Sequence, residues 1–183
     1  FYYTTTGWMM WNWLVGGLAT GSSIFLFDGA PVYPKTDILL EYCQKKKINL
    51  FGVSAKYIDH LKNEKYNSKN LDLSSIKIIT STGSPLAEES FKYVYENIKQ
   101  DVHLASIAGG TDMVGCLVLG NLYSNVYKGE IQGQSLAIDI DVFTEDGKST
   151  KDGEKGELVV KQPFPSMPVK FWGDDTGKKY HNA

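Results

Sequence analysis

The chain has 183 residues and 42% of them are hydrophobic, so it is long enough to bury a core as one domain or slightly more. Its 19 basic and 21 acidic residues are spread along the sequence and leave a net charge of −2, which argues against a nucleic-acid partner or an anionic membrane surface. The two cysteines, Cys43 and Cys116, lie far apart in apolar contexts, which argues against a disulfide framework or a cysteine metal site and favours a cytoplasmic protein.

The apolar run at residues 8–20 is too short and too interrupted for the roughly 20 residues that cross a membrane. No basic segment precedes it, so it does not read as a signal peptide. The sequence has no initiator Met, and Phe1 already resembles the middle of a strand. We therefore expect the chain to be an internal piece of a longer protein.

Hydrophobic patterning predicts strands and helices in alternation. In chain order these are a strand at 1–6, a buried helix at 8–19, a strand at 22–28, a helix capped by Thr36-Asp37 and ending near Lys46, a strand at 49–54, a helix at 55–63, a strand at 75–84, a helix at 86–100 and a strand at 101–107. Such alternation predicts an α/β fold with mainly parallel sheets flanked by helices.

The pattern changes after about residue 115. Apolar and polar residues alternate at 135–143 and at 155–163, with an Asp146-Gly147 turn between them, which predicts an antiparallel hairpin. We therefore divide the chain into an α/β part at 1–115 and a small β-rich part at 116–183.

Several familiar motifs are absent from the sequence. The GKS letters at 147–149 lack the upstream glycine of a phosphate-binding loop, because Val142 occupies that position. Neither GxGxxG nor HExxH occurs, and His60, His103 and His181 are scattered, so the sequence does not indicate a dinucleotide-binding fold or a metalloprotease.

Four other segments occur in a distinctive order. They are FYYTTTGWMMWNWLVGGLATGSSIFLFDGAPVYP, STGSPLAEES, SIAGGTDMVG and KGELVVKQPFPSMPVKFWGDD. Together they resemble the middle of an acyl-CoA synthetase of the adenylate-forming family, and the TTGWMMWNW and PFPSMPVKFW segments resemble the branch that uses acetoacetate. The resemblance implies a piece of the large N-terminal, AMP-binding domain. It also implies that a small carboxylic acid reacts with ATP in the presence of Mg²⁺ and that the acyl group is then transferred to coenzyme A.

The STGSPL segment has two interpretations. The resemblance implies that Gly83, Ser84 and Pro85 lie along the adenine, where glycine permits close approach of a flat ring. The same residues also suit a plain strand-to-helix connection, with Ser84 as the cap and Pro85 at the first helical position.

The SIAGGTDMVG segment supplies the candidate catalytic residues. The resemblance implies that Ala108, Gly109 and Gly110 contact the nucleotide, that Thr111 hydrogen-bonds its phosphate and that Asp112 ligates Mg²⁺. Many relatives have Glu where this chain has Asp112, so direct and water-bridged coordination both remain open. A Thr-Asp helix cap is the structural alternative.

The resemblance also assigns an acid pocket to Trp8, Met9, Met10 and Gly109. In similar acetyl-CoA synthetases a tryptophan matches Gly109, so the absence of a side chain is expected to open room for an acid larger than acetate. The alternative for residues 8–13 is core packing, which we expect for Trp11 and Trp13.

The family's phosphate loop would precede Phe1, and its ribose-binding aspartate and C-terminal domain would follow Ala183. We therefore expect the chain alone to lack activity, and to expose apolar surfaces through which it could associate. Two alternatives stay open: another short- or medium-chain acyl-CoA synthetase, and a non-catalytic α/β binding module.

Overall fold

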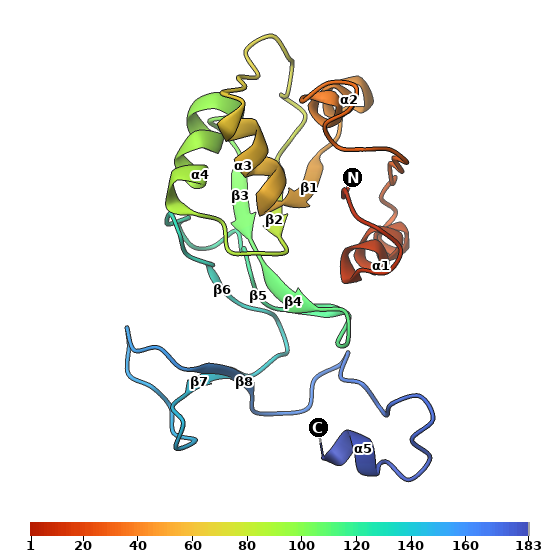
Figure 1. Cartoon of the computed structure of the whole chain (residues 1–183), viewed down its shortest axis with the longest axis vertical. Coiled ribbons are helices and arrows are strands. Elements are labelled where there is room, and N and C mark those ends of the chain that lie inside the picture. The colour runs from red at the N-terminus through yellow and green to blue at the C-terminus, as the bar shows by residue number, and fades with distance from the viewer. Residues whose placement is uncertain (183) are drawn as a thin grey trace.

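The structure is a computed structural model that describes residues 1–182. Figure 1 shows an α/β part that contains the N-terminal half of the chain, and a less regular part below it that contains β7, β8 and α5. Among residues 1–182, every helix is too short or too polar to span a bilayer.

A three-stranded parallel sheet lies at the centre of the α/β part (Figure 1). Its strands are β1 (Leu50–Ser54), β2 (Ile78–Thr82) and β3 (His103–Ser106), and they lie in that order. Gly52 pairs with Thr80, which in turn pairs with Ala105. The prediction of parallel pairing from alternating strands and helices is therefore confirmed.

Three helices follow the predicted ranges and enclose the main core. They are α2 (Ile38–Lys46), α3 (Ala55–Asn63) and α4 (Glu88–Tyr93), which continues as a π-helical turn, η2 (Val94–Ile98). The Ser54 hydroxyl caps α3 by accepting a hydrogen bond from the Tyr57 N–H at 3.2 Å. The side chains buried between these helices and the sheet include Leu39, Leu40, Phe51, Ile76, Phe91 and Leu104.

The predicted Thr36-Asp37 side-chain cap of α2 is wrong. Asp37 occupies the N-cap position, but its side chain makes no capping hydrogen bond there. Its carboxylate accepts a hydrogen bond from the Tyr66 hydroxyl at 3.1 Å instead. The Asp37 side chain therefore makes a tertiary contact instead of capping α2.

The N-terminal segment differs most from the prediction. The predicted strand at 1–6 is reduced to a parallel bridge between Tyr2 and Gly52. The predicted strand at 22–28 is absent, because residues 23–28 make no hydrogen bond to another backbone group within the described chain. Its rings still pack: Phe25 lies 5.1 Å from Phe1, between ring centroids. This run is therefore apolar because its side chains pack against the core, and not because it pairs as a strand.

The helix predicted at 8–19 forms as α1 (Met9–Gly16) followed by a 3₁₀ turn, η1 (Gly17–Thr20). Only Met9 and Met10 of α1 are buried. The expectation that the helix is buried is therefore wrong, as is the expectation that Trp13 is a core residue, since 37% of Trp13 is exposed.

Beyond the parallel sheet, pairing becomes antiparallel. β4 (Ala108–Gly110), β5 (Gly115–Leu119) and β6 (Gly133–Gln134) form one sheet, and β7 (Ile140–Phe143) and β8 (Glu157–Val160) form another. The predicted hairpin is confirmed by β7 and β8, whereas the sheet of β4, β5 and β6 was not predicted. Gly147 has a φ of 72° in the turn between β7 and β8, a conformation that favours glycine. A short helix, α5 (Lys178–His181), follows. The division at residue 115 stays a prediction.

Candidate functional site

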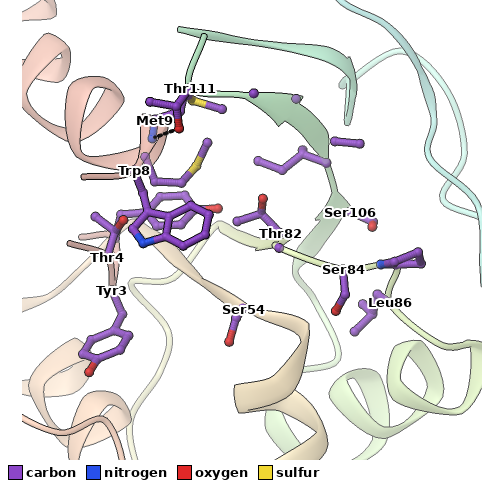
Figure 2. A pocket seen from close by; sticks show the side chains of 18 of the residues that line it. Tyr3, Thr4, Trp8, Met9, Ser54, Thr82, Ser84, Leu86, Ser106 and Thr111 are labelled. Carbon is purple, nitrogen blue, oxygen red and sulfur yellow. Dashed lines mark hydrogen bonds between the residues drawn. The ribbon is translucent and has the colours of Figure 1, made fainter. Parts of the chain in front are cut away.

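A cavity of about 700 Å³ lies at the carboxyl ends of the parallel strands (Figure 2). Ser54, Thr82 and Ser106, the last residues of β1, β2 and β3, all line it. The N-terminal end of α1 and the β4 strand form other parts of its wall. This edge of an α/β sheet is where ligands usually bind.

The cavity brings together residues from the sequence segments that we singled out. The predicted site residues on its wall are Trp8, Met9, Met10, Gly83, Ser84, Pro85, Ala108, Gly109, Gly110 and Thr111. Asp112 is not on the wall. Sequence reasoning missed other lining residues, which include Tyr2, Tyr3, Thr4, Thr5, Ser54, Thr82, Leu86, Ser106, Ile107, Gly129 and Ile131. Polar residues at the ends of predicted parallel strands were the signal that could have found Ser54, Thr82 and Ser106.

Thr111 is tied to the start of α1 (Figure 2). Its Oγ1 accepts a hydrogen bond from the Met9 backbone N–H at 3.1 Å. Met9 is the first residue of α1, where backbone N–H groups have no partner inside the helix. Because the hydroxyl uses its oxygen as an acceptor here, its own proton remains available for donation.

The turn after β2 depends on Gly83. This residue has a φ of 85°, a left-handed conformation that L-amino acids with side chains rarely adopt, and the space around its Cα is open. Ser84 and Pro85 are exposed beside it, and the buried Leu86 anchors the turn to the core. The helix begins only at Glu88, with Ala87 as its N-cap. The alternative interpretation of Ser84 as a helix cap is therefore wrong.

The packing of β4 against β5 requires glycine at position 109, which the sequence did not reveal. A Cβ at this position would collide with the carbonyl oxygen of Gly115 and with the Cα of Cys116 on the paired strand β5. The missing side chain thus permits close approach of β4 and β5. This contradicts the expected physical explanation, in which the missing side chain leaves space in the cavity, although Gly109 itself lines the cavity.

Asp112 follows Thr111 in the turn between β4 and β5. The exposed carboxylate of Asp112 folds back over Gly110. A Cβ at Gly110 would collide with Oδ1 of Asp112. Within residues 1–182, no three His, Cys, Asp or Glu side chains are grouped closely enough to hold a metal ion. A single exposed carboxylate still fits Mg²⁺ that takes its other ligands from phosphates and water.

Tyr2 lines the cavity, but its hydroxyl is shielded from the open space. Only 6% of the residue is exposed, and its hydroxyl is buried beside the hydroxyls of Thr80 and Thr82. Burial raises the pKa of Tyr2 far above its ordinary value, and the neighbouring hydroxyls of Thr80 and Thr82 offset only part of this effect. The phenol is therefore protonated at every physiological pH.

Comparisons with known proteins identify relatives of this chain. The family model described as AMP-binding enzyme matches residues 2–167. An acetoacetyl-coenzyme A synthetase from Rhizobium meliloti (strain 1021) is 52% identical over 100% of this chain and 28% of its own length. The structure of acetoacetyl-CoA synthetase from Streptomyces lividans superposes with a TM-score of 0.92 at 39% identity, over 99% of this chain and 28% of that one.

A benzoate CoA ligase from Burkholderia xenovorans LB400 shares the fold, with a TM-score of 0.73 at 19% identity over 91% of this chain and 32% of that one. The chain thus spans little more than a quarter of the length of the acetoacetyl-CoA synthetases it matches. Since the family model covers most of the sequence, the chain belongs to the family of AMP-binding enzymes.

Proposed function

We propose that this chain forms part of an ATP-dependent acid–CoA ligase that activates acetoacetate. In the first step a carboxylate oxygen bonds to the α-phosphorus of ATP and pyrophosphate leaves. In the second step the thiol sulfur of coenzyme A attacks the acyl carbon, and AMP leaves. One observation carries the proposal: a single cavity at the strand ends gathers the segments around Trp8, Gly83 and Thr111.

The nucleotide is assigned to the side of the cavity formed by residues 83–85 and 108–111. The open space at Gly83 and the exposed ring of Pro85 suit a flat adenine. Thr111 is assigned to a phosphate oxygen, because Met9 occupies the acceptor side of its hydroxyl and its proton is left to donate.

Asp112 is assigned to Mg²⁺, either directly or through a water molecule. Bound Mg²⁺ supplies positive charge that offsets the negative charge of the phosphates. The carboxylate of Asp112 lies over the backbone of Gly110, which lines the cavity, so it would be held beside the nucleotide rather than in the acid pocket.

The acid is assigned to the apolar wall of Trp8, Met9 and Met10, with the backbone of Gly109 nearby. Methionine side chains are unbranched and adapt to the shape of a ligand. Coenzyme A enters as the second substrate, and no residue of this chain is assigned to it. A cytoplasmic location remains a prediction from cysteine usage.

The experiment is a panel of acids tested with a full-length ligase that carries this sequence. Acid-dependent exchange of pyrophosphate into ATP is measured with acetate, acetoacetate, butyrate and longer acids. The proposal predicts the highest kcat/KM with acetoacetate. A preference for butyrate or a longer acid would support the alternative of a medium-chain synthetase. No exchange with any acid, together with no heat on titration of ATP, would support a non-catalytic binding module.

A further inference from the structure

The β5–β6 connection, residues 120–132, supplies two residues to the cavity wall, Gly129 and Ile131. No residue of this connection has a role in the reaction described above. In Figure 1 the connection runs beside α4. A Cβ at Gly129 would lie 2.9 Å from Cγ of Glu88, the first residue of α4. The connection therefore borders the cavity where the turn at 83–85 leads into α4, which is the side assigned to the nucleotide.

Gln132 holds the two ends of the β5–β6 connection together and joins them to the parallel sheet. Its Oε1 lies 2.7 Å from Nε2 of His103, the first residue of β3, and accepts a hydrogen bond from the Asn121 N–H at 3.2 Å. Its Nε2 donates to the carbonyl oxygens of Asn121 at 3.0 Å and Ser124 at 2.8 Å. A single half-buried amide thus makes all of these contacts.

A second set of contacts holds the β5–β6 connection against α4. Nζ of Lys128 lies 2.8 Å from Oε2 of Glu88, although both side chains are more than half exposed, so the ion pair alone contributes little. The next residue, Gly129, has a φ of 79°, in the left-handed region that favours glycine. Glycine is therefore required at position 129 both by the backbone conformation and by the close approach to Glu88.

Little else fixes the β5–β6 connection. Among residues 121–131, the one hydrogen bond between backbone groups of the described chain joins the Glu130 N–H to the Tyr127 carbonyl at 3.2 Å. Val126 packs against the main core, whereas Leu122 and Tyr123 are exposed. The place of this wall segment thus depends on the contacts of Gln132 and on the conformation of Gly129, rather than on strand pairing.

We propose that the β5–β6 connection is a positioning loop for the nucleotide, and that Gln132 and Gly129 hold it as the wall that closes the nucleotide side of the cavity. The inference rests on the proposed function and adds two positioning residues to it. A displaced loop would widen the cavity beside the turn at 83–85 and weaken nucleotide binding, because a wall that is already in place has no ordering cost on binding. The acid side, at Trp8 and Met9, would keep its shape.

The first test compares Gly129→Ala with Gly147→Ala in a full-length ligase that carries this sequence. Gly147 is the matched control, because its φ is also positive, at 72°, but the space around it is open and it does not line the cavity. For each variant, kcat and the KM values for ATP and for acetoacetate are measured. We expect Gly129→Ala to raise KM for ATP roughly tenfold while kcat and KM for acetoacetate change by less than about twofold. Gly147→Ala is expected to keep all three within about twofold.

A second variant keeps the test available if Gly129→Ala does not fold. Gln132→Glu preserves the size of the side chain but removes the N–H donors to the carbonyl oxygens of Asn121 and Ser124. The same split is expected, with a higher KM for ATP and an unchanged KM for acetoacetate. Gln134→Glu, at an exposed position two residues further on and off the cavity wall, is the control and should change neither value.

Three outcomes would overturn the inference. The first is an unchanged KM for ATP in a folded Gly129→Ala or Gln132→Glu variant, which would mean that the loop does not position the nucleotide. The second is an equal rise of KM for ATP and for acetoacetate, which would indicate a general structural role. The third is the same rise of KM for ATP in Gly147→Ala, which would show that backbone strain anywhere has this effect. Failure of the proposed function is distinct, because the unmodified ligase would then not activate acetoacetate at all.

Discussion

Thr111 and Met9 are 102 positions apart in sequence, yet one hydrogen bond joins them. The family resemblance implied a phosphate contact for Thr111, but nothing in the sequence indicated its acceptor role at the start of α1. That contact gives the hydroxyl a defined orientation, with its proton free for a ligand. Under the proposed function, replacing Thr111 would therefore affect both the start of α1 and the bound nucleotide.

Thr111→Val in a full-length ligase is expected to lower kcat for pyrophosphate exchange by roughly a hundredfold or more, because it removes a donor directed at developing phosphate charge. Thr111→Ser keeps the hydroxyl and is the control, with activity within a few-fold of the unmodified enzyme. Equal activity of the Val and Ser variants would show that the hydroxyl does not serve catalysis.

Gly109→Ala tests the explanation that this glycine permits close approach of β4 and β5. Since a Cβ would collide with β5, the substitution is expected to destabilise the chain by about 1–3 kcal/mol in urea denaturation. Gly16→Ala, in α1 with open space around it, is the control and is expected to stabilise by about 0.5–1 kcal/mol. Unchanged stability in Gly109→Ala, with the activity of a full-length ligase carrying the same substitution shifted toward smaller acids, would favour the explanation based on pocket volume.

The reactivity of the two cysteines tests whether they are buried. Burial raises the pKa of Cys43 to about 12 and that of Cys116 to about 11, so both stay as thiols at pH 8. We expect no reaction with a disulfide reagent in the native chain and rapid reaction of both cysteines in urea. Fast reaction of either cysteine before unfolding would contradict the packing described here.

At the scale of elements, the sequence correctly predicted the strands that are short apolar runs placed between helices. The strands at 50–54, 78–82 and 103–106 are short apolar runs between helices, and their parallel pairing followed from that order. The run at 22–28 has the same composition, but forming a strand requires a backbone partner, which composition does not reveal. The position of Tyr2 over Gly52 was equally unpredictable, because it depends on the approach of two segments distant in sequence.

A polar network joins α3 and α4. The Lys62 ammonium donates to the Ser90 hydroxyl at 2.7 Å, and that hydroxyl donates to the Asp59 carboxylate at 2.6 Å. Ser90 is fully buried. Ser90→Ala leaves both charged partners without the bridging hydroxyl, and we expect a loss of about 1–3 kcal/mol. The check is a lower urea midpoint with an unchanged m-value, whereas an unchanged midpoint would mean that the network contributes nothing to stability.

At the scale of the whole molecule, the described chain leaves large apolar side chains uncovered. Leu122, Tyr123, Leu136, Val169 and Trp172 are all more than three-quarters exposed. Apolar surface of this kind favours association. We expect the isolated chain to show a molar mass that rises with concentration in analytical ultracentrifugation. A monomer at all concentrations would contradict this expectation.

The isolated chain is also expected to be inactive, since it spans only 28% of the length of the Rhizobium meliloti relative. ATP-dependent thioester formation by the purified 183-residue chain would refute this prediction. The family resemblance pointed to residues 8–10, 83–85 and 108–111. That these three segments line one cavity could be seen only in the structure.

The central claim is that this cavity holds the acyl-adenylate. Its most direct test is calorimetric titration of a full-length ligase that carries this sequence with a non-hydrolysable acetoacetyl-adenylate mimic. Ala108→Trp adds an indole on the cavity wall, and Leu136→Trp adds one at an exposed position that does not line the cavity. The account predicts that Ala108→Trp abolishes the heat of binding while Leu136→Trp retains it. Undiminished binding by a folded Ala108→Trp variant would contradict the claim.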